Sequence, residues 1–468
     1  MNSKYHIIIV GGGLAGLAAA KTLSQYNLNI MIIDENVHIG GQFLRKMTEV
    51  MSNIGLTEAH RLKKIGRKLI KYLDCHKIKI LDRSEVLGIY PGMRLFVKDR
   101  TDRILELNSE FVICATGARE KYLPFKGWTL PGVISTGAAQ VMIKGSHVLP
   151  AKKILIGGCG PIPYALAGEI NSIGGQVLAI LDQTLPTQKI RLMSLWRHHL
   201  PKIFDGANYL LKLLLSNTKI RQGVRIIEVK KKPLGIEVIT SEVDQREPTI
   251  STNKTVYQTE TLAVGYGLTP NIELPQQAGC KLIFKREKGG AAVEVDCHME
   301  TSVKNIFAVG ETTGIGGAKK SYIEGYIAAL SILNRLELIK DKAFQDKIII
   351  LKRHQQKENQ YGHFLNKICH IPANNYYSID DEAIICRCEN ITMRTIRNQM
   401  ANGFKNVIGL KNATRCGMGS CQGRICGPII HDILRAYTRQ SSIEIGLLSA
   451  QFPVKPVKVG ALAALDYY

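Results

Sequence analysis

The sequence IIIVGGGLAG at residues 7–16 joins an apolar run to a glycine-rich turn near the start of the chain. Gly11, Gly13 and Gly16 fit the pattern G-x-G-x-x-G. Glycines in this pattern allow a tight turn, close approach of the backbone to a pyrophosphate, and close packing of the next helix on the strand. The N-terminus of that helix carries partial positive charge, which favours a phosphate. The stretch therefore predicts the strand, turn and helix of a dinucleotide-binding unit.

Two acidic residues, Asp34 and Glu35, follow directly after the second apolar run of this unit. An acid at about this distance from the glycine turn bonds a ribose hydroxyl in dinucleotide-binding folds. The sequence does not distinguish between the two, so both are candidates for this role.

Three further stretches resemble motifs of flavoproteins similar to glutathione reductase and thioredoxin reductase. They are HIGGQ at 38–42, CATG at 114–117 and NIFAVGE at 305–311. The resemblance implies that FAD binds to this unit, and that Glu311 takes the place of the acid that contacts the ribityl chain in those relatives. The predicted FAD-binding residues are the glycines and polar side chains of these segments: Gly11, Gly13, Gly16, Asp34 or Glu35, Gly41, Gln42, Thr116, Gly117, Gly310 and Glu311.

Those reductases also carry a cysteine pair beside the flavin, and this chain lacks one at the matching places. Residues 42–47 contain no cysteine, and Cys159 stands alone in its glycine turn. We therefore do not expect dithiol reduction.

A second unit of the same type begins at residues 153–163, where Gly158 and Gly160 open another glycine turn. Pro163 stands where the third small residue is expected, and a proline there removes an N–H group near the start of the helix. Nucleotide binding and a retained fold with a degraded or repurposed site are both open. If a nucleotide binds, Asp182 at the end of the next strand favours NAD over NADP, with another adenine nucleotide as an alternative.

Alternating strand and helix patterns predict an α/β protein with two dinucleotide-binding domains, one interrupting the other, and a small helical C-terminal iron–sulfur domain. The expected boundaries are 1–148 and 262–340 for the FAD-binding domain, 149–261 for the NAD(P)-binding-like domain, 341–377 for a connector, 378–440 for the [2Fe–2S] domain and 441–468 for the C-terminal tail.

Five of the eleven cysteines lie between residues 386 and 426, where they can bind a metal. We predict a [2Fe–2S] cluster held by Cys386, Cys388, Cys421 and Cys426, because the C-x-C start differs from the C-x₂₋₄-C spacing common in structural zinc sites. Zinc, disulfides and free thiols are the alternatives. We expect Cys416 to lie near the cluster as a non-ligand. Nearby glycines leave room for backbone N–H groups to bond the cluster sulfurs: Gly417, Gly419, Gly423 and Gly427.

The net charge of +23 is spread over most of the chain, and no segment carries a nucleic-acid-binding motif. We therefore expect no nucleic-acid partner and interpret the charge as a solvated basic surface, with an acidic protein partner as the alternative. No run reaches the roughly 18 apolar residues of a membrane helix. We expect a cytoplasmic protein, with peripheral attachment at the inner face of the membrane as a second possibility.

Several longer stretches together resemble one family, the FAD-binding alpha subunits of opine oxidase, hydrogen cyanide synthase and dye-linked proline and hydroxyproline dehydrogenases. The C-terminal part of the chain is similar to bacterioferritin-associated ferredoxin domains. These stretches are FKGWTLPGV at 125–133, GETTGIGG at 310–317, RCE at 387–389, TRCGMGSCQGRICG at 414–427 and PVKP at 453–456.

The resemblance implies an oxidoreductase subunit that passes electrons within an amino-acid, imino-acid or opine dehydrogenase complex. The substrate would be oxidised on a separate beta subunit of the D-amino-acid or glycine oxidase type, and a small ferredoxin-like subunit is a further candidate partner. In keeping with this division, we assign no catalytic residue for amine oxidation in this chain. The alternatives are a stand-alone NADH-dependent flavin and iron–sulfur reductase, and a non-enzymatic assembly or nucleotide-sensing subunit.

Overall fold

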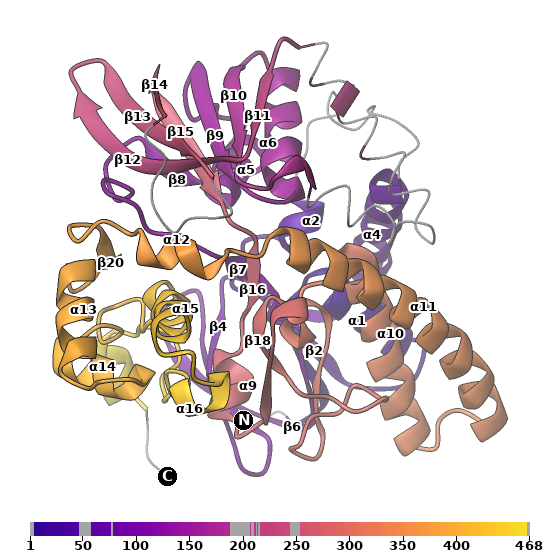
Figure 1. Cartoon of the computed structure of the whole chain (residues 1–468). Coiled ribbons are helices and arrows are strands. Elements are labelled where there is room, and N and C mark those ends of the chain that lie inside the picture. The colour runs from indigo at the N-terminus through magenta and orange to yellow at the C-terminus, as the bar shows by residue number, and fades with distance from the viewer. Residues whose placement is uncertain are drawn as a thin grey trace.

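The computed structural model describes residues 4–45, 58–75, 78–187, 206, 210–211, 213, 216–243 and 253–465. Figure 1 shows two α/β units, a small helical unit at the C-terminal end, and one long helix that runs along the side of the first unit. Among the described residues, no helix is both long and apolar enough to cross a membrane.

The first unit is built on a seven-stranded sheet of order β3-β2-β1-β6-β5-β4, with β19 also paired to β6. Strand β1 pairs in parallel with β2 and with β6, and the paired ends of these strands, at residues 7–10, 30–33 and 111–114, are apolar, as expected for strands that are covered on both faces. The strands are β1 (Lys4–Val10), β2 (Ile30–Ile33), β3 (Lys79–Leu81), β4 (Glu85–Tyr90), β5 (Arg94–Lys98), β6 (Ile104–Cys114) and β19 (Ile306–Ala308).

One face of this sheet is covered by helices that come from distant parts of the chain. Ile7, Ile9 and Ile113 pack there against the apolar side chains of α1 and α10. The helices of this unit are α1 (Leu14–Leu23), α2 (Gly41–Leu44), α4 (Glu58–Cys75), α9 (Glu273–Gln277) and α10 (Ala318–Arg335), and its short elements are β17 (Leu282–Lys285), η2 (Arg286–Lys288), β18 (Gly290–Val293) and η3 (Gly310–Thr313).

The second unit has a five-stranded parallel sheet of order β11-β10-β9-β15-β8 and a separate three-stranded antiparallel sheet. Helices α5 and α6 cover one face of the parallel sheet. The elements are β8 (Val133–Ser135), α5 (Thr136–Ser146), β9 (Lys153–Gly158), α6 (Pro161–Ser172), β10 (Gln176–Asp182), β11 (Lys219–Gln222), β12 (Val224–Lys232), β13 (Gly235–Glu242), β14 (Lys254–Thr259) and β15 (Thr261–Gly265).

This second sheet extends beyond the range 149–261 that we expected for the second domain. Strand β8 lies before that range, and most of β15 lies after it, yet both pair within the sheet. The boundaries were missed because β8 and β15 pair with each other although they lie far apart in sequence, and a local sequence pattern does not reveal such a pairing. The two crossings are β7 (Ala118–Glu120) and β16 (Leu268–Pro270), which pair with each other in antiparallel fashion.

A 28-residue helix, α11 (Asp341–Ile368), leads from the first unit to the C-terminal unit. Figure 1 shows α12 (Ala373–Tyr377) lying between the second unit and the C-terminal helices. The remaining elements are β20 (Ile384–Cys386), β21 (Ile391–Thr392), α13 (Met393–Ala401), α14 (Val407–Thr414), α15 (Cys426–Thr438), α16 (Ser442–Ile445) and α17 (Val459–Ala463).

The C-terminal unit shares one apolar core with the second unit. Leu155 and Val264 from the parallel sheet belong to the same buried cluster as Ile385, Leu410 and Ile430. The indole N–H of Trp128 also donates to the carbonyl oxygen of Ile384 at 2.6 Å. The helical unit is therefore fixed against the rest of the chain by both apolar burial and hydrogen bonding.

Candidate functional site

Two of the three glycines in the turn between β1 and α1 have no room for a side chain, and the third faces open space. A Cβ atom on Gly11 would lie 2.2 Å from the carbonyl oxygen of Ala115, and one on Gly16 would lie 2.0 Å from the carbonyl oxygen of Gly11. A Cβ on Gly13 would meet no atom within 4 Å, so this glycine leaves open space. Helix α1 begins at that point with no side-chain cap. Its first N–H groups can therefore serve a pyrophosphate, as expected for FAD.

The structure separates the two acidic candidates that follow β2. Asp34 is 5% exposed, and its Oδ2 accepts a hydrogen bond from the Gly12 amide at 2.6 Å. Glu35 is exposed, and its Oε2 pairs with Lys455 Nζ at 2.6 Å near the C-terminus. Asp34 therefore lies against the glycine turn, whereas Glu35 fastens the C-terminal segment.

The Gly40–Gly41 turn lies directly on this glycine turn. The amide of Gly40 donates to the carbonyl oxygen of Gly12 at 2.7 Å, and a Cβ on Gly41 would lie 3.0 Å from the Cα of Gly13. Gln42 is exposed at the start of α2. The predicted residues of this stretch therefore lie beside the first turn, with Gln42 on its outer side.

The predicted motif at Thr116 and Gly117 meets the late motif at η3. The Gly117 amide donates to Thr312 Oγ1 at 3.2 Å, and Thr116 Oγ1 lies 3.0 Å from the same hydroxyl oxygen. Next to Thr312, the carboxylate of Glu311 accepts from the amides of Gly316 at 3.0 Å and Gly317 at 2.7 Å. Burial raises the pKa of Glu311 above its usual value. The fold thus unites segments that are far apart in sequence.

A buried ion pair that sequence reasoning missed shapes the η3 turn. Lys320 Nζ contacts Glu324 Oε2 at 3.1 Å, and both side chains are almost fully buried. The same ammonium group donates to the carbonyl oxygens of Gly310 at 2.7 Å and Gly314 at 2.8 Å. A Lys–Glu pair four residues apart on a helix is a recognisable sequence signal, but only the fold shows that it is buried. The pair holds the turn that carries Glu311.

The glycine turn of the second unit is occupied by the end of α11. A Cβ on Gly160 would lie 2.2 Å from Cys369 Sγ, and Cys159 Sγ lies 3.5 Å from the carbonyl oxygen of Cys369. The predicted ribose acid, Asp182, is buried and accepts a hydrogen bond from Tyr164 Oη at 2.6 Å. Gly160 and Asp182, which were predicted to bind a second nucleotide, therefore contact Cys369 and Tyr164 of this chain.

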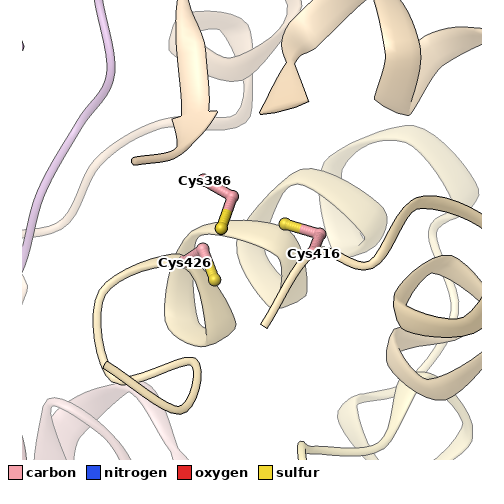
Figure 2. A group of neighbouring side chains, drawn as sticks. All are labelled: Cys386, Cys416 and Cys426. Atoms are coloured by element: carbon pink, nitrogen blue, oxygen red, sulfur yellow. The ribbon is translucent and has the colours of Figure 1, made fainter. Parts of the chain in front are cut away.

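The cysteine-bearing unit gathers three thiols at its centre. Figure 2 shows the side chains of Cys386, Cys416 and Cys426 pointing toward one another, and their sulfur atoms all lie within 4.8 Å of each other. Thiolate ligands of one tetrahedral metal ion, at about 2.3 Å from it, lie roughly 3.8 Å apart. The group therefore fits a metal centre. Sequence reasoning expected Cys416 only as a neighbour, and the structure places its sulfur in the tight group.

The other two predicted ligands, Cys388 and Cys421, form a second pair close by. The Cys421 amide and thiol both donate to Cys388 and lower the pKa of its thiol. A Cβ on Gly419 would lie 2.1 Å from the Cβ of Cys388, so only glycine fits at this position of the loop. All five clustered cysteines thus face one region of the fold.

Backbone amides and thiols direct their hydrogens at these sulfur atoms. Hydrogen bonds from the thiols of Cys416 and Cys426, and from the amides of Gly417 and Glu389, hold the pKa of Cys386 far below its usual value. Burial raises the pKa of Cys421, and hydrogen bonds from the amides of Ile425 and Gly423 act against this shift. Such N–H donors stabilise the negative charge of thiolates and of cluster sulfurs. The amides of Gly417 and Gly423 therefore lie beside cysteine sulfurs, and their bonding to the sulfurs of a cluster stays a prediction.

Comparison with known families identifies the class. Residues 5–331 match the pyridine nucleotide-disulphide oxidoreductase family, and the chain belongs to it. Residues 384–436 match the BFD-like [2Fe-2S] binding domain. The two matches confirm the predicted fold class and the assignment to the oxidoreductases, and they support FAD and a [2Fe–2S] cluster as the cofactors.

Individual relatives cover almost the whole chain. It is 29% identical to the A subunit of opine oxidase from Rhizobium meliloti, over 99% of this chain and 88% of that protein. It is 30% identical to the HcnB subunit of hydrogen cyanide synthase from Pseudomonas aeruginosa, over 98% of both chains. The crystal structure of L-proline dehydrogenase from P. horikoshii has the same fold, with a TM-score of 0.72 at 20% identity over 98% of this chain and 80% of that one. The predicted resemblance is thereby confirmed.

Proposed function

We propose that this chain is the electron-passing subunit of a dehydrogenase or oxidase complex that acts on amino acids, imino acids or opines. The observation that carries the proposal is that one chain joins an FAD-type glycine turn to a cysteine-bearing unit in which three thiols lie within 4.8 Å of one another. Flavins exchange two electrons and [2Fe–2S] clusters exchange one, so the pair suits a chain that receives electrons in pairs and releases them singly.

The residues that would hold FAD are those around the first glycine turn. We assign the pyrophosphate to the turn at Gly11–Gly16 and the ribose to Asp34, because that acid contacts the turn and Glu35 does not. Gly41, Gln42, Thr116, Gly117, Gly310 and Glu311 complete the proposed site.

For the cluster we keep Cys386, Cys388, Cys421 and Cys426 as the ligands. The Cys386 and Cys388 thiols have lowered pKa values because neighbouring groups donate hydrogen bonds to their sulfurs. We propose Cys416 as a neighbour that contacts the ligands Cys386 and Cys426.

The names of the relatives support a partner chain. Two of them are named as subunits, of opine oxidase and of hydrogen cyanide synthase. We propose that the substrate is oxidised on an oxidase-like beta subunit of the D-amino-acid or glycine oxidase type, with a small ferredoxin-like subunit as a further partner. We propose the cytoplasm as the location.

The rival function, a stand-alone NADH-dependent reductase, needs a second nucleotide site. Cys369 lies against Gly160 where the backbone would have to approach a pyrophosphate, and Tyr164 contacts Asp182. Pro161 and Pro163, in the first turn of α6, also lack the N–H groups that would bond a phosphate. These contacts favour the electron-passing function over NADH oxidation.

Chemical analysis of the purified full chain tests the proposal. We expect one FAD, two iron atoms and two acid-labile sulfides per chain, with a flavin spectrum and a [2Fe–2S] electron paramagnetic resonance signal after reduction. Zinc in place of iron, or a chain without flavin, would contradict the proposal.

A further inference from the structure

The crossing strand β7 presents alternate residues to opposite sides, as side chains in a strand do. The carboxylate of Glu120 faces α5, where it accepts from Thr136 Oγ1 at 2.5 Å and from the Gly137 amide at 2.9 Å. Arg119, and Lys121 directly after the strand, face the C-terminal unit, where Lys121 Nζ pairs with Asp432 at 2.5 Å. The strand that joins the two α/β units is thus also the strand that holds the cysteine-bearing unit.

On one side, Arg119 is connected to the proposed FAD site. Its Nη1 donates to Asn271 Oδ1 at 2.9 Å. Asn271 in turn donates from Nδ2 to the carbonyl oxygen of Thr116 at 2.9 Å and accepts at its own carbonyl from Thr116 Oγ1 at 2.8 Å. Two hydrogen-bonded steps therefore link the guanidinium group to the CATG motif.

On its other side, Arg119 is connected to the cysteine loop. Its Nε donates to the carbonyl oxygen of Arg424 at 3.0 Å. Arg424 lies between Cys421 and Cys426 in sequence, and its Nη1 donates to the carbonyl oxygen of Cys421 at 3.2 Å. A single guanidinium group therefore contacts both the FAD-side network and the backbone between two predicted ligands.

Glu273 fixes the orientation of this guanidinium group. Arg119 Nη2 lies 2.7 Å from Glu273 Oε1, and Nη1 donates to Oε2 at 3.0 Å. Burial acts to raise the pKa of Glu273, but the Arg119 charge holds it below its usual value. The two-pronged contact restricts rotation of the arginine, a geometry that lysine cannot reproduce.

We propose that Arg119 is a positioning residue that holds the cysteine loop at a fixed place relative to the FAD site and thereby sets the rate of electron passage between the two cofactors. The inference rests on the proposed function. In this passage one electron leaves the reduced flavin and converts one ferric ion of the cluster to the ferrous state. Arg119 itself forms and breaks no covalent bond.

The test compares Arg119→Lys and Arg119→Gln with wild-type full-length protein that holds both cofactors. Arg335→Gln is the matched control, because Arg335 makes the same kind of contacts, with both oxygens of Glu300 at 2.6 Å and with Asn305 Oδ1 at 3.0 Å, away from the cysteines. A photoreduced deazaflavin radical delivers one electron. The subsequent equilibration between flavin and cluster is followed by absorbance, and the cluster by electron paramagnetic resonance.

We expect both Arg119 variants to slow this equilibration several-fold, because a cysteine loop released from Arg119 no longer holds the cluster at a fixed distance from the flavin, and electron transfer slows as that distance grows. The resonance line shape should change as well, whereas Arg335→Gln should match wild type in both measurements. A wild-type rate and line shape in Arg119→Gln would overturn the proposal. If Arg119→Gln loses a cofactor, a wild-type rate and line shape in Arg119→Lys would overturn the proposal instead. Lysine keeps the positive charge but cannot make the two-pronged contact of the guanidinium group. A wild-type chain without FAD or iron is a different result, which contradicts the proposed function instead.

Discussion

The Sγ atom of Cys369 lies 2.2 Å from the point that a Cβ atom on Gly160 would occupy. The end of α11 is therefore seated on the glycine turn that would have to bind the pyrophosphate of a second nucleotide. Arg225 of the second unit also holds the segment after α11 in place. Its Nη1 donates to Asn375 Oδ1 at 3.2 Å and to Ser378 Oγ at 2.7 Å. The second unit serves in the structure as the platform on which the connector and the cysteine-bearing unit rest.

This contact predicts an energetic coupling between the two residues. Gly160→Ala should destabilise the protein by about 1–3 kcal/mol, because φ of +80° is unfavourable for alanine and its Cβ meets the sulfur. In a Cys369→Ala background the collision with sulfur disappears and only the backbone strain remains. Chemical unfolding of the two single variants and the double variant measures the coupling. Strictly additive effects would show that the sulfur does not press on the turn.

Asp34 should matter for FAD and Glu35 should not. Asp34→Ala leaves the Gly12 amide without its 2.6 Å acceptor and removes the proposed ribose ligand. A hydrogen bond to a charged group contributes about 1.5–3 kcal/mol, so FAD should bind roughly 10- to 100-fold more weakly. Glu35→Ala is the control, since exposed ion pairs such as Glu35–Lys455 contribute about 0–1 kcal/mol. Fluorescence titration of the two FAD-free variants gives their affinities for FAD. A larger loss of FAD affinity in Glu35→Ala than in Asp34→Ala would show that Glu35, and not Asp34, binds the ribose.

Gly419→Ala should remove the cluster without unfolding the chain. The added Cβ would lie 2.1 Å from the Cβ of Cys388, so that cysteine must move away from Cys421. Overpacking of this kind costs about 1–3 kcal/mol. Iron and sulfide content per chain is the measurement, and Gly460→Ala, whose added Cβ meets no atom within 4 Å, is the control. Full iron content in Gly419→Ala would mean that the loop does not need this glycine.

Glu311 should make the FAD-free chain less stable as the pH rises. Burial raises the pKa of Glu311 in the folded chain above its value in the unfolded chain. The protonated carboxyl is therefore the form that folding favours, and its contribution is fully present below the unfolded pKa and lost as the pH rises through the folded one. Glu311→Gln cannot ionise and should escape this loss. Unfolding of both FAD-free proteins at pH 4 and pH 8 should show the glutamine variant gaining relative to wild type at the higher pH. An unchanged difference between the two pH values would contradict the expected ionisation.

Local sequence signals predicted the parts of the fold that depend on neighbouring residues. The turn at Gly11–Gly16 could be assigned because its glycine spacing, between an apolar strand and a helix, is itself a local pattern. The cysteine positions could be assigned as a metal-binding group for the same reason, since their spacing is itself the signal.

Contacts between distant segments were beyond sequence reasoning. The preference for Asp34 over Glu35 arises from burial against Gly12, and the pairing of β8 with β15 arises from two crossings of the chain. The position of Cys369 on Gly160 joins segments more than 200 residues apart. None of these has a local pattern, because each is decided by which surfaces the packed units bring together.

Anaerobic rapid mixing tests the central claim most directly. Holo-protein is mixed with NADH, alone and after assembly with a candidate oxidase-like subunit, and the assembled complex is mixed with a panel of amino acids, imino acids and opines. We predict that a member of the panel bleaches the flavin and produces the reduced-cluster resonance signal only in the assembled complex, and that NADH does neither at a catalytic rate. Rapid bleaching of the isolated chain by NADH would contradict the account.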